Sequence, residues 1–338
     1  SWSKPSTTSF MTSLQNSVLG NTTGGRFDQL PIDAKTMAEH FHDAGYQTAV
    51  FTSNPWAGSF ANLERGVDAV RDAGAEVDSR SSVELHREFW EWREAYPGAP
   101  YWVHFQPTDV HQPHTPQAPF AGLFAPIGTE QRIEAENLAA NTGDDANPRI
   151  LEADPTAWMD SWDSAGVGRV QHFDARRAMY DEALAHQDYQ LGKLVDRLKE
   201  SGEWENTLLI VAADHSIEAA VRPDFRRFGG DRAALDAPWA ILRTSVSRVP
   251  LVLIWPGRIP AGQRLLERVS MIDVLPTALD LAGLPAPDVL QGQSLAPLLL
   301  GQPGWEPRGI IIEEARVEVD AVAAHLSELA DGNHGLWC

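Results

Sequence analysis

Asp214 and His215 are the residues best suited to metal chemistry, because they follow directly on the continuous apolar run Leu208–Ala213. That run has the length and composition of a buried strand in a parallel sheet. In open α/β sheets, ligands bind beyond the carboxyl ends of the strands, where a carboxylate and an imidazole can both ligate one divalent cation. An aspartate there is equally typical of a helix N-cap, and the dipeptide alone leaves both interpretations open.

A second group of candidates follows the apolar segment Tyr101–Phe105. Asp109, His111 and His114 stand within six residues, among prolines that restrict the backbone. Such side chains can bind a metal ion or protonate a leaving group. A proline-braced surface loop with incidental histidines explains them as well, and the local sequence alone slightly favours that interpretation.

The N-terminal segment Ser3–Ser9 is rich in hydroxyl groups, which usually cap helices or form turns. Ser3 alone therefore indicates a helix cap. Gly292-Gln293-Ser294 approaches the nucleophile elbow of esterases but lacks its second glycine, which argues against a Ser-His-Asp esterase. The glycine motifs of nucleotide-binding loops are absent from the sequence, so nucleotide binding has no support.

Alternating helices and short apolar strands must position these residues. Periodicity and stop signals predict helices over Ala34–Gly45, Ser81–Tyr96, Asp174–Glu200 and Ile272–Gly283, and strands over Gln47–Phe51, Tyr101–Phe105, Thr207–Ala213 and Val249–Trp255. This order predicts an α/β fold with a largely parallel central sheet covered on both faces.

Two features depart from that regular pattern. Asp188 lies on the apolar stripe of the long helix between Leu184 and Leu191, so it is expected to be buried and paired with a backbone N–H or an arginine. Residues 129–168 are acidic and rich in Asn, Asp, Ala and Gly. They predict a surface insertion, with an active-site lid as the functional alternative.

The charge balance limits the possible partners. Lys and Arg total 27 against 47 for Asp and Glu, a formal net charge of -20, which argues against nucleic acid. An anionic substrate would need a local metal ion or a few placed cations. No apolar run approaches the roughly 20 residues of a membrane span. The single cysteine, Cys338, leaves the compartment of a soluble protein open between cytoplasm and periplasm.

Taken together and in order, five stretches resemble the sulfatase family of the alkaline-phosphatase superfamily. Trp2–Ser13 is similar to the segment with Cys, Ser or Thr before x-Pro-Ser, and Thr36–Thr48 is similar to T-L-A-E-x-L followed by G-Y-x-T. Asp109–Pro113 is similar to D-x-H-x-P, and Asn206–His215 is similar to N-T-L, apolar residues and D-H-G. The fifth stretch is the signature within Arg248–Leu295. The match covers about Ser1–Gly301. It implies an alkaline-phosphatase-like α/β/α sandwich over residues 1–316, followed by a divergent or truncated tail at 317–338.

The resemblance also implies roles. Ser3 would be the nucleophile and would coordinate one divalent cation, Ca²⁺, Mg²⁺ or Mn²⁺, together with Asp214 and His215. His111 would contact the transferred group or assist the leaving oxygen. The substrate would be a small anionic ester, and the oligomeric state is not implied. Two further residues, Asn54 and His114, would bind the substrate.

The sequence departs from the family pattern at several positions. The metal-binding Asp pair of the family lies upstream of the nucleophile, so this sequence is interpreted as a fragment without that pair and its strand. Thr7 stands where formylglycine-type sulfatases keep an arginine, which favours an unmodified Ser3 hydroxyl. Ser216 replaces a glycine, and no lysine shortly precedes Arg248. Arginines that could replace that lysine, or simply lie on the surface, are Arg226, Arg227 and Arg232.

Three functions remain open. The first is a sulfatase-like hydrolase that cleaves sulfate esters through a metal-bound hydroxyl. The second is a phosphodiester or phosphonate monoester hydrolase, favoured by Asn54, the plain hydroxyl and the missing arginine. The third is a catalytically inactive sulfatase-fold protein that binds a partner, motivated by the absent Asp pair.

Overall fold

The computed structural model describes residues 3–20, 30–72, 80–111, 117–126, 129, 169–216 and 247–313. The chain divides into two compact units. The first comprises Ser1–Thr108, Leu194–Ser216 and Ile241–Gly335, and the second comprises Asp109–Lys193, Ile217–Ala240 and Leu336–Cys338. Apart from Thr129, the predicted insertion at 129–168 lies outside the described residues, as does the tail at 317–338.

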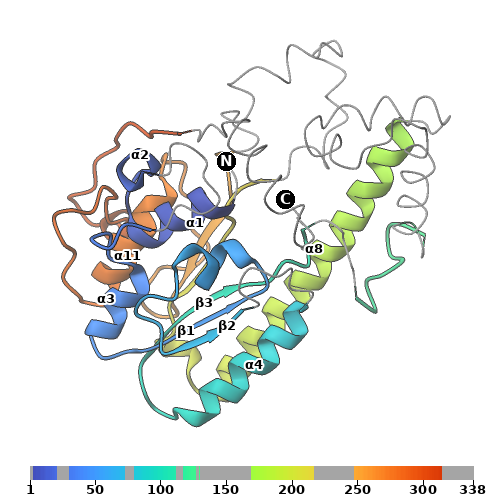
Figure 1. The fold of residues 1–338 in the computed structure, drawn as a ribbon, viewed down its shortest axis with the longest axis horizontal. Helices are drawn as coiled ribbons and strands as arrows, with labels where there is room; N and C mark the ends of the chain where they lie inside the picture. Colours follow the sequence, from blue (N-terminus) through green and yellow to red (C-terminus); the bar gives the residue numbers. More distant parts are fainter. Residues whose placement is uncertain are drawn as a thin grey trace, which may run out of the picture. The chain divides into compact units, whose positions relative to one another are not determined.

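The first unit is built on a parallel sheet (Figure 1). Strands β1 (Gln47–Thr52), β2 (Ala69–Arg71) and β3 (Tyr101–Gln106) lie in the order β2-β1-β3. Both neighbours of β1 run parallel to it, and Thr52 pairs with Gln106 at the carboxyl end. Two of the predicted strands are therefore confirmed to within a residue, and so is the α/β class.

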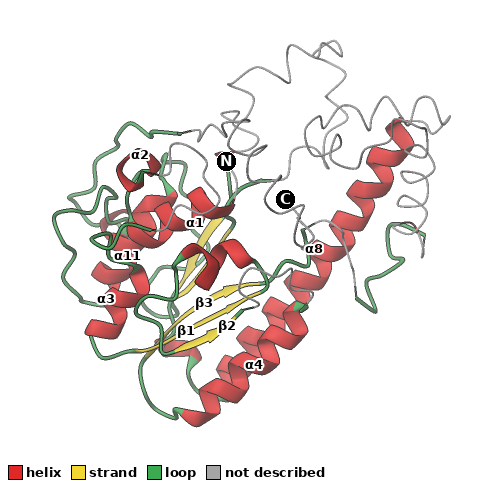
Figure 2. Cartoon of the chain, in the orientation of Figure 1, coloured by secondary structure: helices red, strands yellow, loops and turns green. Residues whose placement is uncertain are grey.

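Helices cover both faces of this sheet (Figure 2). Ala49 and Phe51 point to one face, where they pack with α4 (Ser82–Ala95) through Leu85 and Phe89. The other face carries α1 (Ser3–Thr12), α3 (Met37–Asp43) and α11 (Val274–Leu281), whose buried side chains form one cluster that Trp102 joins. The period-2 alternation of the strands thus supplies both halves of the core.

A second, two-stranded sheet departs from the predicted parallel arrangement. β4 (Leu209–Ala212) and β5 (Leu251–Ile254) pair antiparallel. Both strands lie where the apolar runs predicted them, but a run of apolar residues fits either strand direction, so hydrophobicity could not decide it. The remaining short elements of this unit are α2 (Asn16–Leu19), α12 (Ala296–Leu299) and 3₁₀ turns at Pro55–Ala57, Ser59–Ala61, Trp204–Asn206 and Met271–Asp273.

Helix α8 (Arg169–Glu200) forms the main described element of the second unit and continues into the first. Its apolar stripe was wrongly predicted: Asp188 is exposed, and so is Leu184, at 47%. The carboxylate therefore stays solvated and needs no buried partner. Side chains buried on this helix include Met179, Glu182, Ala183, His186 and Gln190. None of the described helices combines the length and apolar character needed to cross a membrane.

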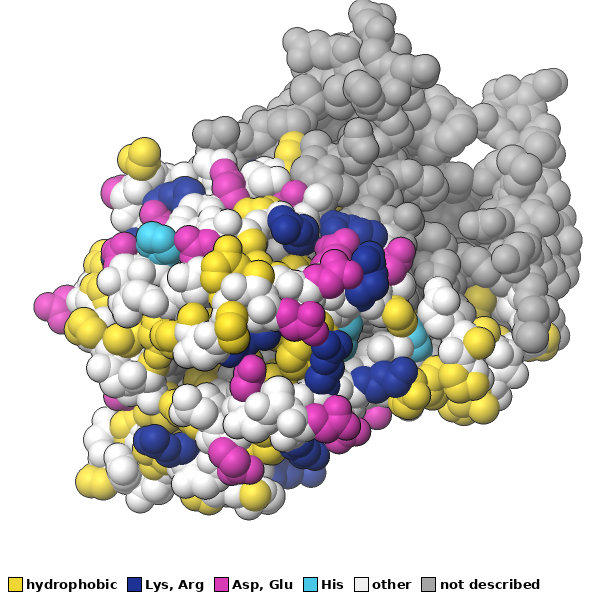
Figure 3. Space-filling model, turned by 90° about the horizontal axis from the view of Figure 1, so that it is seen from below, with side chains coloured by type: hydrophobic (Ala, Val, Ile, Leu, Met, Phe, Trp, Pro, Cys, Tyr) yellow, Lys and Arg dark blue, Asp and Glu magenta, His cyan; other side chains and the backbone are white. Residues whose placement is uncertain are grey.

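Basic and acidic side chains are interspersed over the face of the described residues that Figure 3 shows. The exclusion of nucleic acid rests on the net charge of -20 and stays a prediction.

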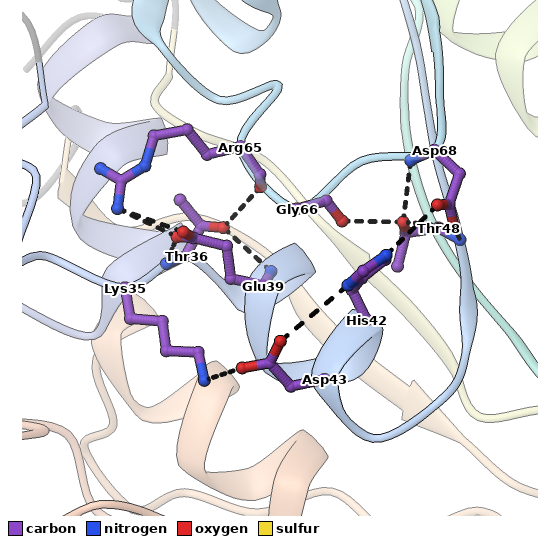
Figure 4. A network of polar contacts seen from close by, with 9 residues as sticks. All are labelled: Lys35, Thr36, Glu39, His42, Asp43, Thr48, Arg65, Gly66 and Asp68. Carbon is purple, nitrogen blue, oxygen red and sulfur yellow. Dashed lines mark hydrogen bonds and ion pairs between the residues drawn. The ribbon is translucent and has the colours of Figure 1, made fainter.

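The T-x-A-E and G-Y-x-T stretches form a structural network (Figure 4). Thr36 caps α3: its hydroxyl accepts from the Glu39 N–H at 3.1 Å, and the Glu39 carboxylate accepts from the Thr36 N–H at 2.8 Å. Arg65 pairs with Glu39 at 3.1 Å. Thr48 donates to the Gly66 carbonyl at 2.7 Å. These motif residues hold helix, strand and loop together, which explains them without a catalytic role.

Replacing Gly66 with alanine is expected to destabilise the protein more than replacing Gly45. Both glycines have positive φ, +73° and +87°. A Cβ on Gly66 would lie 2.4 Å from the Glu39 Cα, whereas a Cβ on Gly45 meets nothing within 4 Å. G45A should cost about 1–2 kcal/mol for its left-handed backbone alone, and G66A about 1–3 kcal/mol more for the clash. Urea unfolding measures both, and equal losses would contradict the close approach.

Candidate active site

The structure brings Ser3 and His215 together within the first unit. Ser3 is the first residue of α1, and His215 follows β4 by three residues. The Ser3 Oγ lies 3.2 Å from the His215 Nε2, although 212 residues separate them in sequence. The two residues with which the resemblance associates a nucleophile and a metal ligand are therefore neighbours.

The hydrogen-bond partners of the His215 ring indicate which of its two nitrogens carries the hydrogen. Nδ1 lies 3.2 Å from the carbonyl oxygen of Ser216, which can only accept, so Nδ1 carries the hydrogen. In the neutral ring Nε2 then presents its lone pair to Ser3, whose hydroxyl donates to it. An imidazole held in this way is also ready to ligate a metal through Nε2.

Asp214 is oriented from both of its oxygens. Oδ1 accepts from the backbone N–H of His215 at 2.9 Å, and Oδ2 accepts from the Gln106 side chain at 3.3 Å. Oδ2 also lies 3.7 Å from the His215 Nε2. The Asp214 and His215 side chains remain 22% and 18% exposed, so a small ligand can reach them.

Gln106 and His104 are the site residues that sequence reasoning missed. Both lie on β3 and share one face of it, while Val103 and Phe105 pack in the apolar core of the other face. The His104 Nε2 lies 3.2 Å from the Gln106 Oε1. Burial lowers the pKa of His104 to about 4, more than the hydrogen bond to Gln106 raises it. The neutral ring donates to Oε1, which turns the amide nitrogen toward Asp214.

These residues offer a partial set of metal donors. Asp214 and His215 supply one carboxylate and one imidazole, and the Ser3 hydroxyl supplies another oxygen. Oxygen and imidazole donors suit a small divalent cation. Over the described ranges, no three His, Cys, Asp or Glu side chains gather into a metal cluster. The chemistry of the donors therefore fits a cation, with fewer charged ligands than a complete site.

Asn54 follows the carboxyl end of β1 and is buried. Its side-chain oxygen accepts from the backbone N–H of Trp56 at 3.0 Å and so caps the 3₁₀ turn Pro55–Ala57. Helix α1, which begins with Ser3, packs against this turn. Asn54 thus has a structural role in the same unit as Ser3.

The other predicted site residues either belong to the second unit or fall outside the residues that the structure describes. His111 belongs to the second unit and is exposed. Thr7 is buried, and its hydroxyl has no hydrogen-bond partner among the described residues. Outside the described residues are His114, Arg226, Arg227 and Arg232.

Comparison with known proteins identifies the class and then the family. Solved structures of a phosphonate monoester hydrolase and of a 2-O GAG sulfatase share the α/β fold of this chain. The family model described as Sulfatase matches residues 2–284. The chain belongs to the sulfatase family.

Curated relatives match a limited part of their own length. Steryl-sulfatase of Rattus norvegicus is 32% identical over 147 residues, 43% of this chain and 26% of that protein. Arylsulfatase D of Homo sapiens is 30% identical over 141 residues, 41% of this chain and 23% of that protein. The aligned part thus spans about a quarter of each relative.

Solved structures share the fold over most of the chain. The phosphonate monoester hydrolase of Agrobacterium radiobacter has a TM-score of 0.65 at 19% identity, covering 95% of this chain and 73% of that one. A protein solved with its substrate D-glucosamine-2-N,6-O-disulfate has a TM-score of 0.57 at 19% identity, covering 94% and 76%. At these identities the likeness shows the fold alone.

The buried, neutral state of His104 predicts a pH-dependent stability. In the unfolded chain His104 becomes protonated below about pH 6.5, whereas in the folded chain its pKa is about 4. The contribution of neutral His104 is therefore present above pH 6.5 and is lost as the pH falls toward 4. His104→Gln should reduce the loss of unfolding free energy between pH 7 and 4.5 by about 2–3 kcal/mol.

Denaturant titrations at the two pH values measure this difference. Val103→Ala, on the same strand, serves as the control, since it removes core contacts without removing a titrating group. An unchanged pH dependence in H104Q would mean that His104 protonates freely in the folded protein.

Proposed function

We propose that this protein is a sulfatase-like hydrolase that cleaves sulfate esters with Ser3 as its nucleophile. The observation that carries the proposal is the 3.2 Å contact between the Ser3 Oγ and the His215 Nε2, at a site that also holds Asp214. Membership of the sulfatase family supports a sulfuric ester as the substrate class. The substrate is a small anionic ester, and its organic group is not specified by these residues.

Each residue has a defined part in the proposed reaction. The Ser3 hydroxyl gives its proton to solvent water as Oγ attacks sulfur, and the bond from sulfur to the organic oxygen breaks with its electron pair on that oxygen. His111 donates a proton to the leaving oxygen, and Asn54 holds a sulfate oxygen through its amide nitrogen. Water then attacks the sulfated Ser3 and releases sulfate, which restores the hydroxyl.

Asp214, His215 and the Ser3 hydroxyl would hold one divalent cation. When bound, such a cation lowers the pKa of a hydroxyl and offsets the negative charge of the anionic ester. In this arrangement Gln106 keeps the Asp214 carboxylate turned toward the site, and the Ser216 carbonyl keeps the lone pair of His215 on Nε2.

A phosphonate monoester or phosphodiester hydrolase is the second candidate. The observation that favours it is Thr7, whose short, buried hydroxyl supplies no positive charge near Ser3. A sulfate group and a phosphonate monoester anion share their size and single charge, so one site can accept both. The fold likeness to phosphonate monoester hydrolases fits this candidate.

Parallel assays with a nitrophenyl sulfate and a nitrophenyl phosphonate monoester decide between the two candidates. We expect kcat/KM to favour the sulfate ester by at least about tenfold, which corresponds to about 1.4 kcal/mol of transition-state preference. A tenfold preference for the phosphonate would assign the protein to the second candidate. Hydrolysis of neither ester would favour a catalytically inactive binding protein.

Ser3→Ala is expected to lower kcat by at least about 10³-fold, because it removes the attacking oxygen and one cation donor. Ser9→Ala is the matched control on the same helix: the Ser9 hydroxyl is buried without a described partner, so its loss should leave kcat within about threefold. Metal analysis by mass spectrometry should find about one equivalent of a divalent cation in the wild type and less in S3A. An active S3A variant would rule out Ser3 as the nucleophile.

A further inference from the structure

The second unit contains a buried polar cluster centred on Asp109, two residues before His111. The Asp109 and His186 side chains are only 2% and 1% exposed, and the Asp109 Oδ1 lies 3.3 Å from the His186 Nδ1. The Gln187 side chain donates to the other Asp109 oxygen at 3.2 Å. Two consecutive residues of α8 therefore hold one carboxylate away from water.

The neighbours of His186 orient its ring. Its Nε2 lies 3.0 Å from the Gln190 Nε2, an amide nitrogen that donates, so the His186 Nε2 is the acceptor. The ring hydrogen is then on Nδ1, the atom nearest to Asp109. Nδ1 faces the Asp109 Oδ1 at 3.3 Å without the alignment of a hydrogen bond, so the two groups are in polar contact inside the unit. The ring of Phe120 lies 6.0 Å away and helps to exclude solvent.

The same helix face fixes the chain that follows the His111 loop. The Glu182 carboxylate, one helical turn before His186, accepts from the backbone N–H groups of Phe124 and Ala125 at 2.6 and 2.7 Å. Phe120 packs against Tyr189 with ring centroids 5.5 Å apart. Both sides of the loop, residues 109–111 and 117–126, are therefore anchored on α8.

We propose that His186 is a positioning residue for His111: it holds Asp109, and Asp109 fixes the loop from which His111 donates a proton to the leaving group. A buried carboxylate is costly unless polar groups surround it, so His186 and Gln187 help to hold Asp109 and the backbone at residues 109–111 in place. This inference rests on the proposed function, since it assigns the purpose of the cluster to the proton transfer by His111.

His186→Leu tests the proposal by removing the polar ring that contacts Asp109 while keeping an apolar side chain of similar size. Two esters of the same acid are compared, one of unsubstituted phenol and one of nitrophenol, whose leaving oxygen needs little protonation. For H186L we expect kcat to fall about 10- to 100-fold on the phenol ester and less than about threefold on the nitrophenol ester, with KM little changed. Equal losses on the two esters would overturn the proposal.

Two further variants separate positioning from a general loss of stability. His186→Asn keeps an amide donor near the place of Nδ1, so it should restore most of the phenol-ester rate. Gln187→Leu removes the amide that donates to Asp109. If H186L folds poorly, Q187L replaces it in the test: its rate should also fall more on the phenol ester than on the nitrophenol ester. Asp188→Asn, at an exposed position of the same helix, is the matched control and should behave as the wild type. The proposal would be overturned if H186N were as slow as H186L on the phenol ester and Q187L were as fast as the wild type.

Hydrogen exchange gives a readout that does not depend on turnover. The amides of residues 109–111 should exchange at least about tenfold faster in H186L than in the wild type or D188N, since their anchor is lost. If the wild type hydrolyses neither ester, the proposed function fails, while faster exchange in H186L alone still supports the anchoring of the loop. Unchanged exchange would overturn the positioning role whatever the activity.

Discussion

The arrangement depends on one constraint: polar residues from separate strands must meet where those strands end. Parallel pairing of β1 with β3 sets Thr52 opposite Gln106, so the two strands stop together. Gln106 then reaches Asp214, which follows β4, and His215 beside it reaches Ser3 at the start of α1. A shift of one residue in any of these strands would turn the side chains to the opposite face and separate them.

Polar side chains at the carboxyl ends of the strands are costly to bury without hydrogen bonds. The hydrogen bonds that His104, Gln106 and Asp214 make also fix the orientation of each side chain. His104 stays neutral because burial disfavours its charged form, and a neutral ring suffices to orient the Gln106 amide. The amide in turn donates to Asp214, whose side chain keeps part of its solvent exposure. The partial exposure of Asp214 avoids the large cost of a fully desolvated carboxylate.

Sequence patterns predicted the elements well, because strand length, apolar content and stop signals are local properties. The predicted strands at 47–51 and 101–105 differ from β1 and β3 by one residue at the carboxyl end. The direction of β5 could not be predicted, since pairing depends on a partner 40 residues away. The buried face of α8 was missed for a different reason. A leucine stripe predicts the buried face of a helix only where the helix packs against apolar residues. This helix instead buries Glu182, which accepts from a backbone N–H, and His186, which contacts the Asp109 carboxylate.

The site was predicted only in part for similar reasons. Ser3, Asp214 and His215 were predicted as site residues because a family pattern marks them, and no local property of Ser3 distinguishes it from a helix cap. Gln106 and His104 escaped notice because polar residues at alternate positions of a strand usually face water. Their role depends on a residue 108 positions from Gln106, so it is defined only in three dimensions.

The strong negative charge of the protein explains why the local arrangement must carry the proposed chemistry. At physiological ionic strength, charges farther than about 8 Å from the site are largely screened, so most of the net charge of -20 acts weakly on a bound anion. Asp214 is close enough to repel it, and the Gln106 amide that contacts Asp214 carries no charge to offset that repulsion. The cation proposed beside Asp214 would offset that repulsion and so favour the approach of an anionic ester to Ser3.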